Sequence, residues 1–213
     1  MIVIHHLNNS RSQRILWLLE ELGLEYRLEQ YQRDAKTNLA PPELLAIHPL
    51  GKSPVMQDGD LILPESGAII EYLIERYGDG RLRPKVGTPE HVRYLYWMHF
   101  AEGTAMLHLV SRLYLTRVGE AAKAMQERVE VMIRNELDLV EAELAKSAHL
   151  AGDEFTAADI QMGFPLEFAV YAGLASDKHT KLREYLGRMQ ARPAYRRAIE
   201  TGGAYVFDTS NPS

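Results

Sequence analysis

The sequence predicts a small α/β domain followed by an all-helical domain. The chain has 213 residues, which is room for one large domain or two small ones. Hydrophobic and charged residues make up 46% and 25% of it, a balance typical of globular proteins. The hydrophobic spacing changes repeatedly in the first part and stays helical in the second, with a Gly- and Pro-rich break between them. We therefore expect an α/β domain at residues 1–79, a linker at 80–88, a helical domain at 89–201 and a tail at 202–213.

Strands and helices alternate in the first domain. The first helix has Ile15, Leu18 and Leu22 on one face, and Gly23 ends it. Asp58-Gly59-Asp60 predicts a tight hairpin turn between two short strands. The expected order is a strand at 2–4, the helix ending at Gly23, a strand at 25–30, a loop at 31–42, a short helix at 43–47, strands at 55–57 and 61–63, and a helix at 65–77.

The second domain shows only helical periodicity. The runs lie at about 89–117, 120–146, 157–171, 181–192 and 194–200. Thr156 and Asp159 form a capping box that starts one of these helices, with Phe155 and Ile160 as its hydrophobic staple. The tail from Thr201 to Ser213 is expected to lie over the surface or to be disordered.

Composition excludes several classes of function. Lys and Arg number 24 against 29 Asp and Glu, and the net charge of −5 argues against nucleic acid as a partner. The absence of cysteine excludes disulfides, thiolate metal sites, a cysteine nucleophile and a redox CxxC motif. No stretch approaches the roughly 18 to 20 apolar residues of a membrane-spanning helix, and the N-terminus has no basic leader or cleavage site. We expect a cytoplasmic protein without a membrane partner.

The histidines do not predict a metal site. His5 and His6 are adjacent in a strand and point to opposite faces, and His99 and His108 fall on opposite sides of a regular helix. The sequence also lacks HExxH, GxGxxG, a P-loop and GxSxG. We therefore expect no metal, no dinucleotide or triphosphate site, and no serine-hydrolase chemistry.

Ser53-Pro54 opens a strand and has two interpretations. A cis peptide would leave the Ser53 backbone N–H and C=O facing outward, where an extended peptide can pair with them. A trans proline in a loop is the commoner state of such a bond.

Two helix starts also have two interpretations each. Glu65-Ser66 suits a helix N-terminus, which is the favoured interpretation on local grounds, but it also suits the ammonium and carboxylate of an α-amino acid. Ser10 and Gln13 match a capping box, yet this is also a place where a bound thiol would lose its proton easily. Because the chain has no cysteine, such a thiol must come from another molecule.

Together these segments resemble the glutathione transferase family. Residues 10–23 look like its first-helix motif, 48–55 like its cis-proline segment, 58–73 like its γ-glutamyl motif and 155–160 like its helical-domain capping box. The match spans roughly residues 1 to 200 in the expected order. The resemblance implies a thioredoxin-like N-terminal domain that binds glutathione, a helical domain with a pocket for a hydrophobic electrophile, and a homodimer.

The resemblance also assigns roles to single residues. Glu65 and Ser66 would hold the γ-glutamyl end, and Ser53 would pair with the cysteinyl backbone. Lys52 would lie near the glycyl carboxylate or the inter-subunit edge. Ser10 is the expected catalytic residue beside the thiolate, as in the serine-type theta- and phi-like branches and their bacterial and fungal relatives.

Some assignments have alternatives. Asn9 or Ser12 can take the position assigned to Ser10, because the alignment is loose across this loop. The basic residues that related branches place after the second strand are missing, and Lys36 or Asn38 would replace them. Met98 and Met106 are candidates for the electrophile pocket, although core packing or a dimer contact is the favoured role for both.

The expected function is that of a glutathione S-transferase. Glutathione would be the cosubstrate, no metal would take part, and detoxification of hydrophobic electrophiles would be the role. Glutathione peroxidase, isomerase and dehalogenase activities use the same thiolate and remain alternatives, as does a non-catalytic binding module of the same fold.

Overall fold

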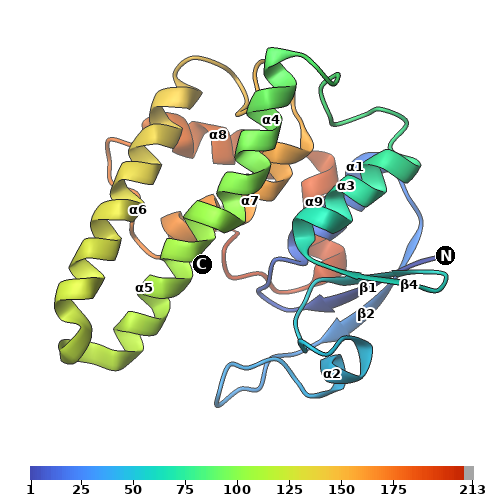
Figure 1. Cartoon of the computed structure of the whole chain (residues 1–213), viewed down its shortest axis with the longest axis horizontal. Coiled ribbons are helices and arrows are strands. Elements are labelled where there is room, and N and C mark those ends of the chain that lie inside the picture. Colours follow the sequence, from blue (N-terminus) through green and yellow to red (C-terminus); the bar gives the residue numbers. More distant parts are fainter. Residues whose placement is uncertain (209–213) are drawn as a thin grey trace. The chain divides into compact units, whose positions relative to one another are not determined.

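The computed structural model describes residues 1–208 (Figure 1). The chain divides into two compact units. The N-terminal unit comprises Met1–Arg83 together with Gln190–Val206, and the helical unit comprises Pro84–Met189 together with the chain from Phe207 onward. We describe each unit by itself.

A four-stranded mixed sheet forms the centre of the N-terminal unit. Its order is β2-β1-β3-β4; β1 and β2 are parallel, and β3 is antiparallel to both β1 and β4. The strands and helices of this part are β1 (Ile2–Leu7), α1 (Gln13–Leu22), β2 (Tyr26–Tyr31), α2 (Glu43–Ile47), β3 (Val55–Asp58), β4 (Leu61–Pro64) and α3 (Ser66–Tyr77). This arrangement confirms the thioredoxin-like fold class.

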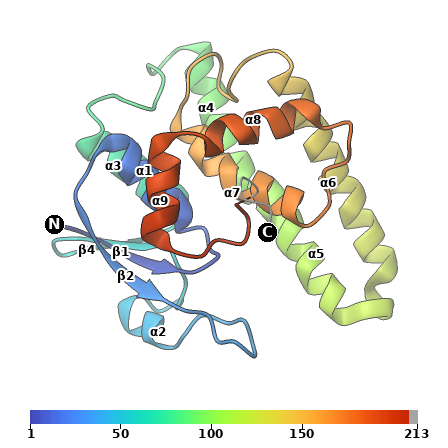
Figure 2. The same cartoon turned by 180° about the vertical axis from the view of Figure 1, so that it is seen from behind.

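The N-terminal core lies between the sheet and its helices. Ile15, Leu18 and Leu19 of α1 are fully buried, as are Ile69 and Ile70 of α3. Gly23 ends α1 with a left-handed backbone (φ 67°), as the sequence predicts. The helices α1 and α3 lie on one side of the sheet and α2 on the other (Figures 1 and 2).

The first strand, β1, contains residues 2–4 together with His5 and His6, as the sequence predicts, and it continues to Leu7. Both imidazoles are buried on opposite faces: His5 Nδ1 is bonded to Tyr31 Oη, and His6 Nδ1 to Ser12 Oγ. Tyr31 comes from the neighbouring strand β2 and Ser12 from the turn before α1, so each buried ring has a hydrogen-bond partner.

The capping box expected at Ser10 and Gln13 does not form. Ser10 Oγ accepts the N–H of Ser12, and Ser12 is the residue before the helix. Both serine hydroxyls point inward to the end of β1, which leaves neither to cap α1. The Gln13 side chain lies against Gly202, and its Nε2 is buried without a hydrogen bond within residues 1–208.

The last helix, α9 (Pro193–Gly202), packs on α1 in the N-terminal unit (Figure 2). Tyr195 meets Trp17 edge to face at 5.1 Å between ring centroids, and Arg192 Nε lies 2.6 Å from Glu21 Oε1. The sequence analysis counted this helix in the helical domain of residues 89–201. Periodicity shows that a segment is helical and amphipathic, but not which core its apolar face joins.

The helical unit contains five α-helices among its described residues. They are α4 (Pro89–Phe100), α5 (Leu107–Val118), α6 (Lys123–Leu144), α7 (Ala157–Tyr171) and α8 (Thr180–Gln190). A π-helical segment, Ala101–Met106, joins α4 to α5, and a 3₁₀ turn, Gly119–Ala122, joins α5 to α6. The single run predicted at 89–117 therefore contains a wider turn, which shifts His108 relative to a regular helix.

The predicted capping box of α7 is confirmed. Asp159 Oδ2 accepts the Thr156 N–H at 2.8 Å, and Asp159 Oδ1 accepts the Leu150 N–H at 3.0 Å and the Tyr185 hydroxyl at 2.8 Å. This fully buried carboxylate ties the start of α7 to α8 and to the preceding loop. Its role is structural.

The described part of the tail is ordered by aromatic contacts. Thr201 and Gly202 still belong to α9, and Phe207 packs on Phe164, Phe168 and Tyr171 of α7 at 5.2–5.4 Å between ring centroids. The rest of the expected tail, residues 209–213, lies outside the described residues.

Within residues 1–208 no helix is long and apolar enough to cross a membrane. In the same part of the chain, no three His, Cys, Asp or Glu side chains gather in a way that would hold a metal ion.

Candidate active site

The start of α1 and the Ser53-Pro54 segment both contact the backbone N–H of Leu7. The Leu7 N–H, at the end of β1, lies 3.1 Å from Ser53 Oγ and 3.3 Å from Ser12 Oγ. Ser53 Oγ also donates to the His5 carbonyl at 2.8 Å. The two serines, forty-one positions apart, therefore lie at the same corner of the sheet.

The Ser53–Pro54 peptide bond is cis, the rarer of the two states considered. The side chain of Ser53 is fixed by its two bonds to β1, but its backbone N–H and C=O have no hydrogen bond within residues 1–208. An open N–H and C=O next to a strand end can pair with an extended peptide.

Glu65 precedes α3 with an unusual backbone. Its φ of 71° and ψ of 114° lie where bulky L-residues are rarely found, and such a conformation costs on the order of 1–3 kcal/mol. The carboxylate is exposed, caps no N–H of α3 and has no hydrogen bond or ion pair in the described chain. The favoured capping role is therefore wrong for Glu65, whose carboxylate is left exposed beside the start of α3.

Ser66 is buried at the first position of α3, and its Oγ accepts a hydrogen bond from Arg14 Nη1 at 3.1 Å. Arg14 lies on α1 and is itself 1% exposed. The sequence analysis missed this link, although an arginine directly before the apolar run of α1 was a usable signal. Arg14 therefore connects the start of α3 to α1, the helix that follows Ser12.

The turn between β1 and α1 contains a buried chain of hydrogen bonds. Ser10 Oγ lies 2.7 Å from Ser12 Oγ, and Ser12 Oγ lies 2.8 Å from His6 Nδ1. His6 Nε2 lies 3.1 Å from the Gly202 carbonyl oxygen. Burial lowers the pKa of His6 to about 4, so its ring is neutral at pH 7.

Arg33 holds the same turn from the other side. Its guanidinium donates to the carbonyl oxygens of Asn8, Asn9 and Asn38 at 3.1–3.4 Å and has no carboxylate partner within residues 1–208. Burial first, and Arg11 second, lower the pKa of Arg33. The turn therefore lies beside the cationic side chain of Arg33, a neighbour that its position in the sequence does not predict.

The residues considered for the glycyl carboxylate are exposed. Lys52 lies beside Ser53, and its ammonium has no partner in the part of the chain that the structure describes. Lys36 and Asn38 lie in the loop after β2, where Asn38 adopts a φ of 59°. Lys52 is thus free to meet an anion.

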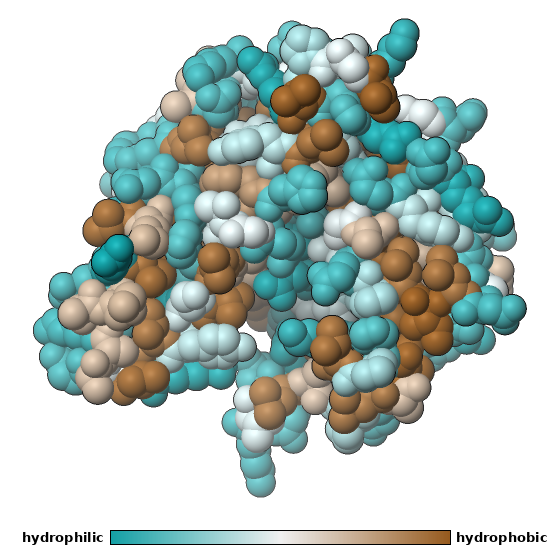
Figure 3. Space-filling model, in the orientation of Figure 1, coloured by the Kyte–Doolittle hydropathy of each residue, from teal (hydrophilic) through white to brown (hydrophobic). Residues whose placement is uncertain are grey.

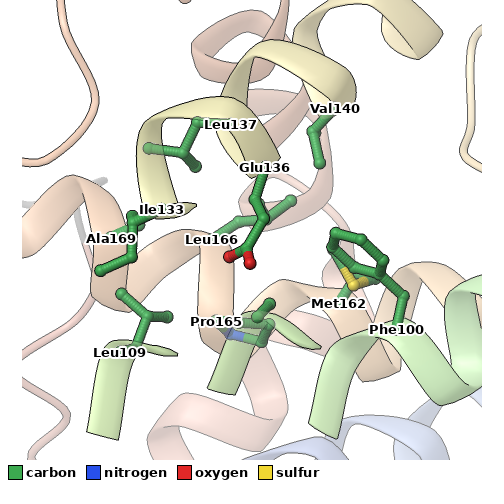
Figure 4. A pocket seen from close by; sticks show the side chains of 11 residues that line it. Phe100, Leu109, Ile133, Glu136, Leu137, Val140, Met162, Pro165, Leu166 and Ala169 are labelled. Carbon is green, nitrogen blue, oxygen red and sulfur yellow. The ribbon is translucent and has the colours of Figure 1, made fainter. Parts of the chain in front are cut away.

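The helical unit has an apolar pocket with one carboxylate in it (Figure 4). The empty volume is about 260 Å³, including open solvent, and its walls come from α5, α6, α7, the end of α4 and the π-helical segment. Glu136 points its carboxylate inward and is bonded to His108 Nδ1. Burial raises the pKa of Glu136, and His108 opposes this shift. Met98 and Met106 are buried but do not line this pocket, in keeping with core packing.

Comparison with known proteins identifies the family. The model of the glutathione S-transferase N-terminal domain matches residues 1–75, and that of the C-terminal domain matches residues 94–193. The chain belongs to the glutathione S-transferase family. Glutathione S-transferase 3 of Schizosaccharomyces pombe is 34% identical over 94% of this chain and 87% of its own length. Glutathione S-transferase 1 of Saccharomyces cerevisiae is 30% identical over 96% of both chains.

Solved structures of glutathione S-transferases share the fold. The enzyme of Actinobacillus pleuropneumoniae has a TM-score of 0.88 and 33% identity, covering 97% of this chain and 94% of its own. A theta class enzyme of Xanthomonas axonopodis pv. citri, solved with glutathione bound, has a TM-score of 0.74 and 28% identity, covering 93% and 96%.

Proposed function

We propose that this glutathione S-transferase binds glutathione along the corner formed by β1, β3 and the starts of α1 and α3, and activates its thiol for attack on a hydrophobic electrophile. One observation carries the proposal: the Leu7 N–H joins Ser12 to Ser53, and Arg14 joins α1 to Ser66. Three segments far apart in the sequence are thereby held as one surface.

The γ-glutamyl end of glutathione would bind at Glu65 and Ser66. It carries an ammonium and a carboxylate on one carbon. The exposed carboxylate of Glu65 suits the ammonium, and the first N–H groups of α3 with the Ser66 hydroxyl suit the carboxylate. The strained Glu65 backbone supports this assignment, since such strain gathers at ligand sites.

The rest of the tripeptide would follow the sheet edge. The open backbone of Ser53 would pair with the cysteinyl residue as a short antiparallel strand does. Lys52, the next residue back, would meet the glycyl carboxylate, with Lys36 and Asn38 as alternatives.

The thiol would then reach the turn at residues 9–12. The Arg33 guanidinium, which has no carboxylate partner within residues 1–208, and the start of α1 favour a thiolate there. The S–H proton leaves to solvent, and a sulfur lone pair forms the new bond to an electrophilic carbon. That carbon either releases a leaving group with the electrons of its bond or, after addition to a double bond, its neighbouring atom takes a proton from solvent. The glutathione bound to the theta class enzyme, at 28% identity, supports this use of the fold.

Calorimetric titration with glutathione tests the proposal. Glu65→Gln should weaken binding about tenfold, because a charge-assisted hydrogen bond is worth about 1.5–3 kcal/mol. Glu75→Gln is the matched control: it removes an exposed carboxylate, paired to Arg83, from the same helix and should leave affinity unchanged. Equal affinities of the two variants would refute the role of Glu65. Turnover with a panel of electrophiles and peroxides would identify the reaction.

We also propose a cytoplasmic homodimer that acts in detoxification. Exposed apolar side chains on β4 (Leu61, Ile62) and on α4 (Val92, Leu95, Tyr96) favour association with a second copy. Figure 3 shows that apolar residues also lie among hydrophilic ones along α5 and α6. Sedimentation velocity would distinguish a dimer from a monomer.

A further inference from the structure

The buried hydrogen-bond chain beside the thiol site has a fixed direction. It ends at the Gly202 carbonyl oxygen, which only accepts, so His6 Nε2 must carry a hydrogen and donate. Since burial keeps the imidazole neutral, the other ring nitrogen, Nδ1, has a lone pair and accepts.

The two serines take their orientation from His6. Ser12 has one hydroxyl proton, and it donates to His6 Nδ1 at 2.8 Å, a shorter contact than the 3.3 Å to the Leu7 carbonyl. Ser12 Oγ then accepts the Ser10 hydroxyl at 2.7 Å. Ser10 is buried, and its proton is directed into the protein. The Ser10 hydroxyl therefore has only lone pairs to offer a bound sulfur.

Asn9, unlike Ser10, has hydrogen-bond donors that are not used in the described part of the protein. The Val206 N–H donates to Asn9 Oδ1 at 2.9 Å, which fixes which end of the amide is the oxygen. The two N–H groups of Asn9 Nδ2 have no acceptor within residues 1–208, and the residue is only half-buried. Its backbone is left-handed (φ 50°), a conformation that asparagine tolerates.

We propose that Asn9 Nδ2 is the side-chain donor to the glutathione thiolate, and that Ser10 is a positioning residue whose proton belongs to the Ser10–Ser12–His6–Gly202 chain. This proposal rests on the proposed function of the corner. Arg33 Nη2, 3.4 Å from the Asn9 carbonyl oxygen, adds positive charge beside the same residue.

The C-terminal segment of the N-terminal unit then takes part in thiol activation. Gly202 sets the direction of the serine chain, and Val206 orients the Asn9 amide. On binding, the thiol releases its proton to solvent and the thiolate accepts an Nδ2–H; only the S–H bond breaks. A hydrogen bond to the charged form lowers a pKa, so the thiol should ionise below its ordinary value.

The pKa of the bound glutathione thiol shows whether Asn9 or Ser10 donates to the thiolate. It is read from the ultraviolet absorbance of the thiolate as pH is varied with glutathione saturating. Asn9→Gly keeps the positive φ and removes the donor, and should raise the thiol pKa by about one unit, a tenfold loss of thiolate at neutral pH. Asn9→Asp should raise it further, since a carboxylate oxygen replaces the donor.

Two further variants complete the test. Ser10→Ala should shift the thiol pKa by less than about 0.3 unit, because it removes no donor to sulfur. Asn8→Asp is the control for added charge, because it places the same negative charge one residue away. The Asn8 Oδ1 already accepts the backbone N–H of Arg33. This variant should therefore shift the thiol pKa less than Asn9→Asp does.

The opposite result, a raised pKa in Ser10→Ala and none in Asn9→Gly, would overturn the proposal while leaving the proposed function intact. If wild-type protein bound no glutathione, the proposed function itself would fail. The two failures are therefore distinguishable in one experiment.

Discussion

The neutral, buried His6 should make folding stability depend on pH. Burial lowers its pKa from 6.5 to about 4, so the unfolded chain takes up a proton at a pH where the folded chain does not. This contribution to stability is fully present above pH 6.5 and is lost as the pH falls toward 4. From these two values, the native state loses about 2.5 kcal/mol between pH 7.5 and pH 4.5 through this residue alone.

The matched variant is His6→Gln, which does not titrate and keeps an amide donor and acceptor. Other groups also titrate over this range, so the informative quantity is the difference between the two proteins. Urea unfolding, followed by tryptophan fluorescence at both pH values, should show wild type losing about 2.5 kcal/mol more than the variant. Equal losses would mean that the pKa of His6 is not lowered in the folded state, and the premise that burial holds this ring neutral would fail.

Two further predictions concern buried links. Asp159→Ala leaves the N–H groups of Leu150 and Thr156 and the Tyr185 hydroxyl without their acceptor, and should cost about 3–5 kcal/mol in urea unfolding; a cost below about 1 kcal/mol would contradict the structural role. Arg14→Met removes the donor to Ser66 Oγ and should weaken glutathione binding about tenfold by calorimetry, at a charge-assisted 1.5–3 kcal/mol. An unchanged dissociation constant would show that Arg14 does not shape the γ-glutamyl site.

Local patterns predicted most of the fold. The 3.6-residue spacing of apolar side chains located the helices, and Gly23 and the Thr156–Asp159 box located two of their ends correctly. Both ends depend on neighbours within a few residues, so the sequence alone contains what is needed.

Features that depend on distant partners were missed. The helix α9 joins the N-terminal unit because α1 offers it an apolar face. The π-helical segment within the run at 89–117 contains Gly103, but an isolated glycine inside a helical pattern does not specify a wider turn. Tertiary contacts decided each of these cases.

The sequence could suggest the positions of candidate site residues, but not the hydrogen bonds that connect them. Ser53, Glu65 and Ser66 could be proposed as site residues because their motifs are short and ordered along the chain. The link through Arg14, the field of Arg33 and the pinning of Asn9 by Val206 required three-dimensional neighbours. Hydrogen-bond direction, which separates Ser10 from Asn9, also needed the Gly202 carbonyl at the end of the chain.

The ionisation of the bound cosubstrate tests the central claim most directly. Wild-type protein saturated with glutathione should show thiolate absorbance with an apparent thiol pKa at least about one unit below the ordinary value near 8.5. A bound thiol that titrates at its ordinary value would contradict the claim that this corner of the N-terminal unit activates glutathione.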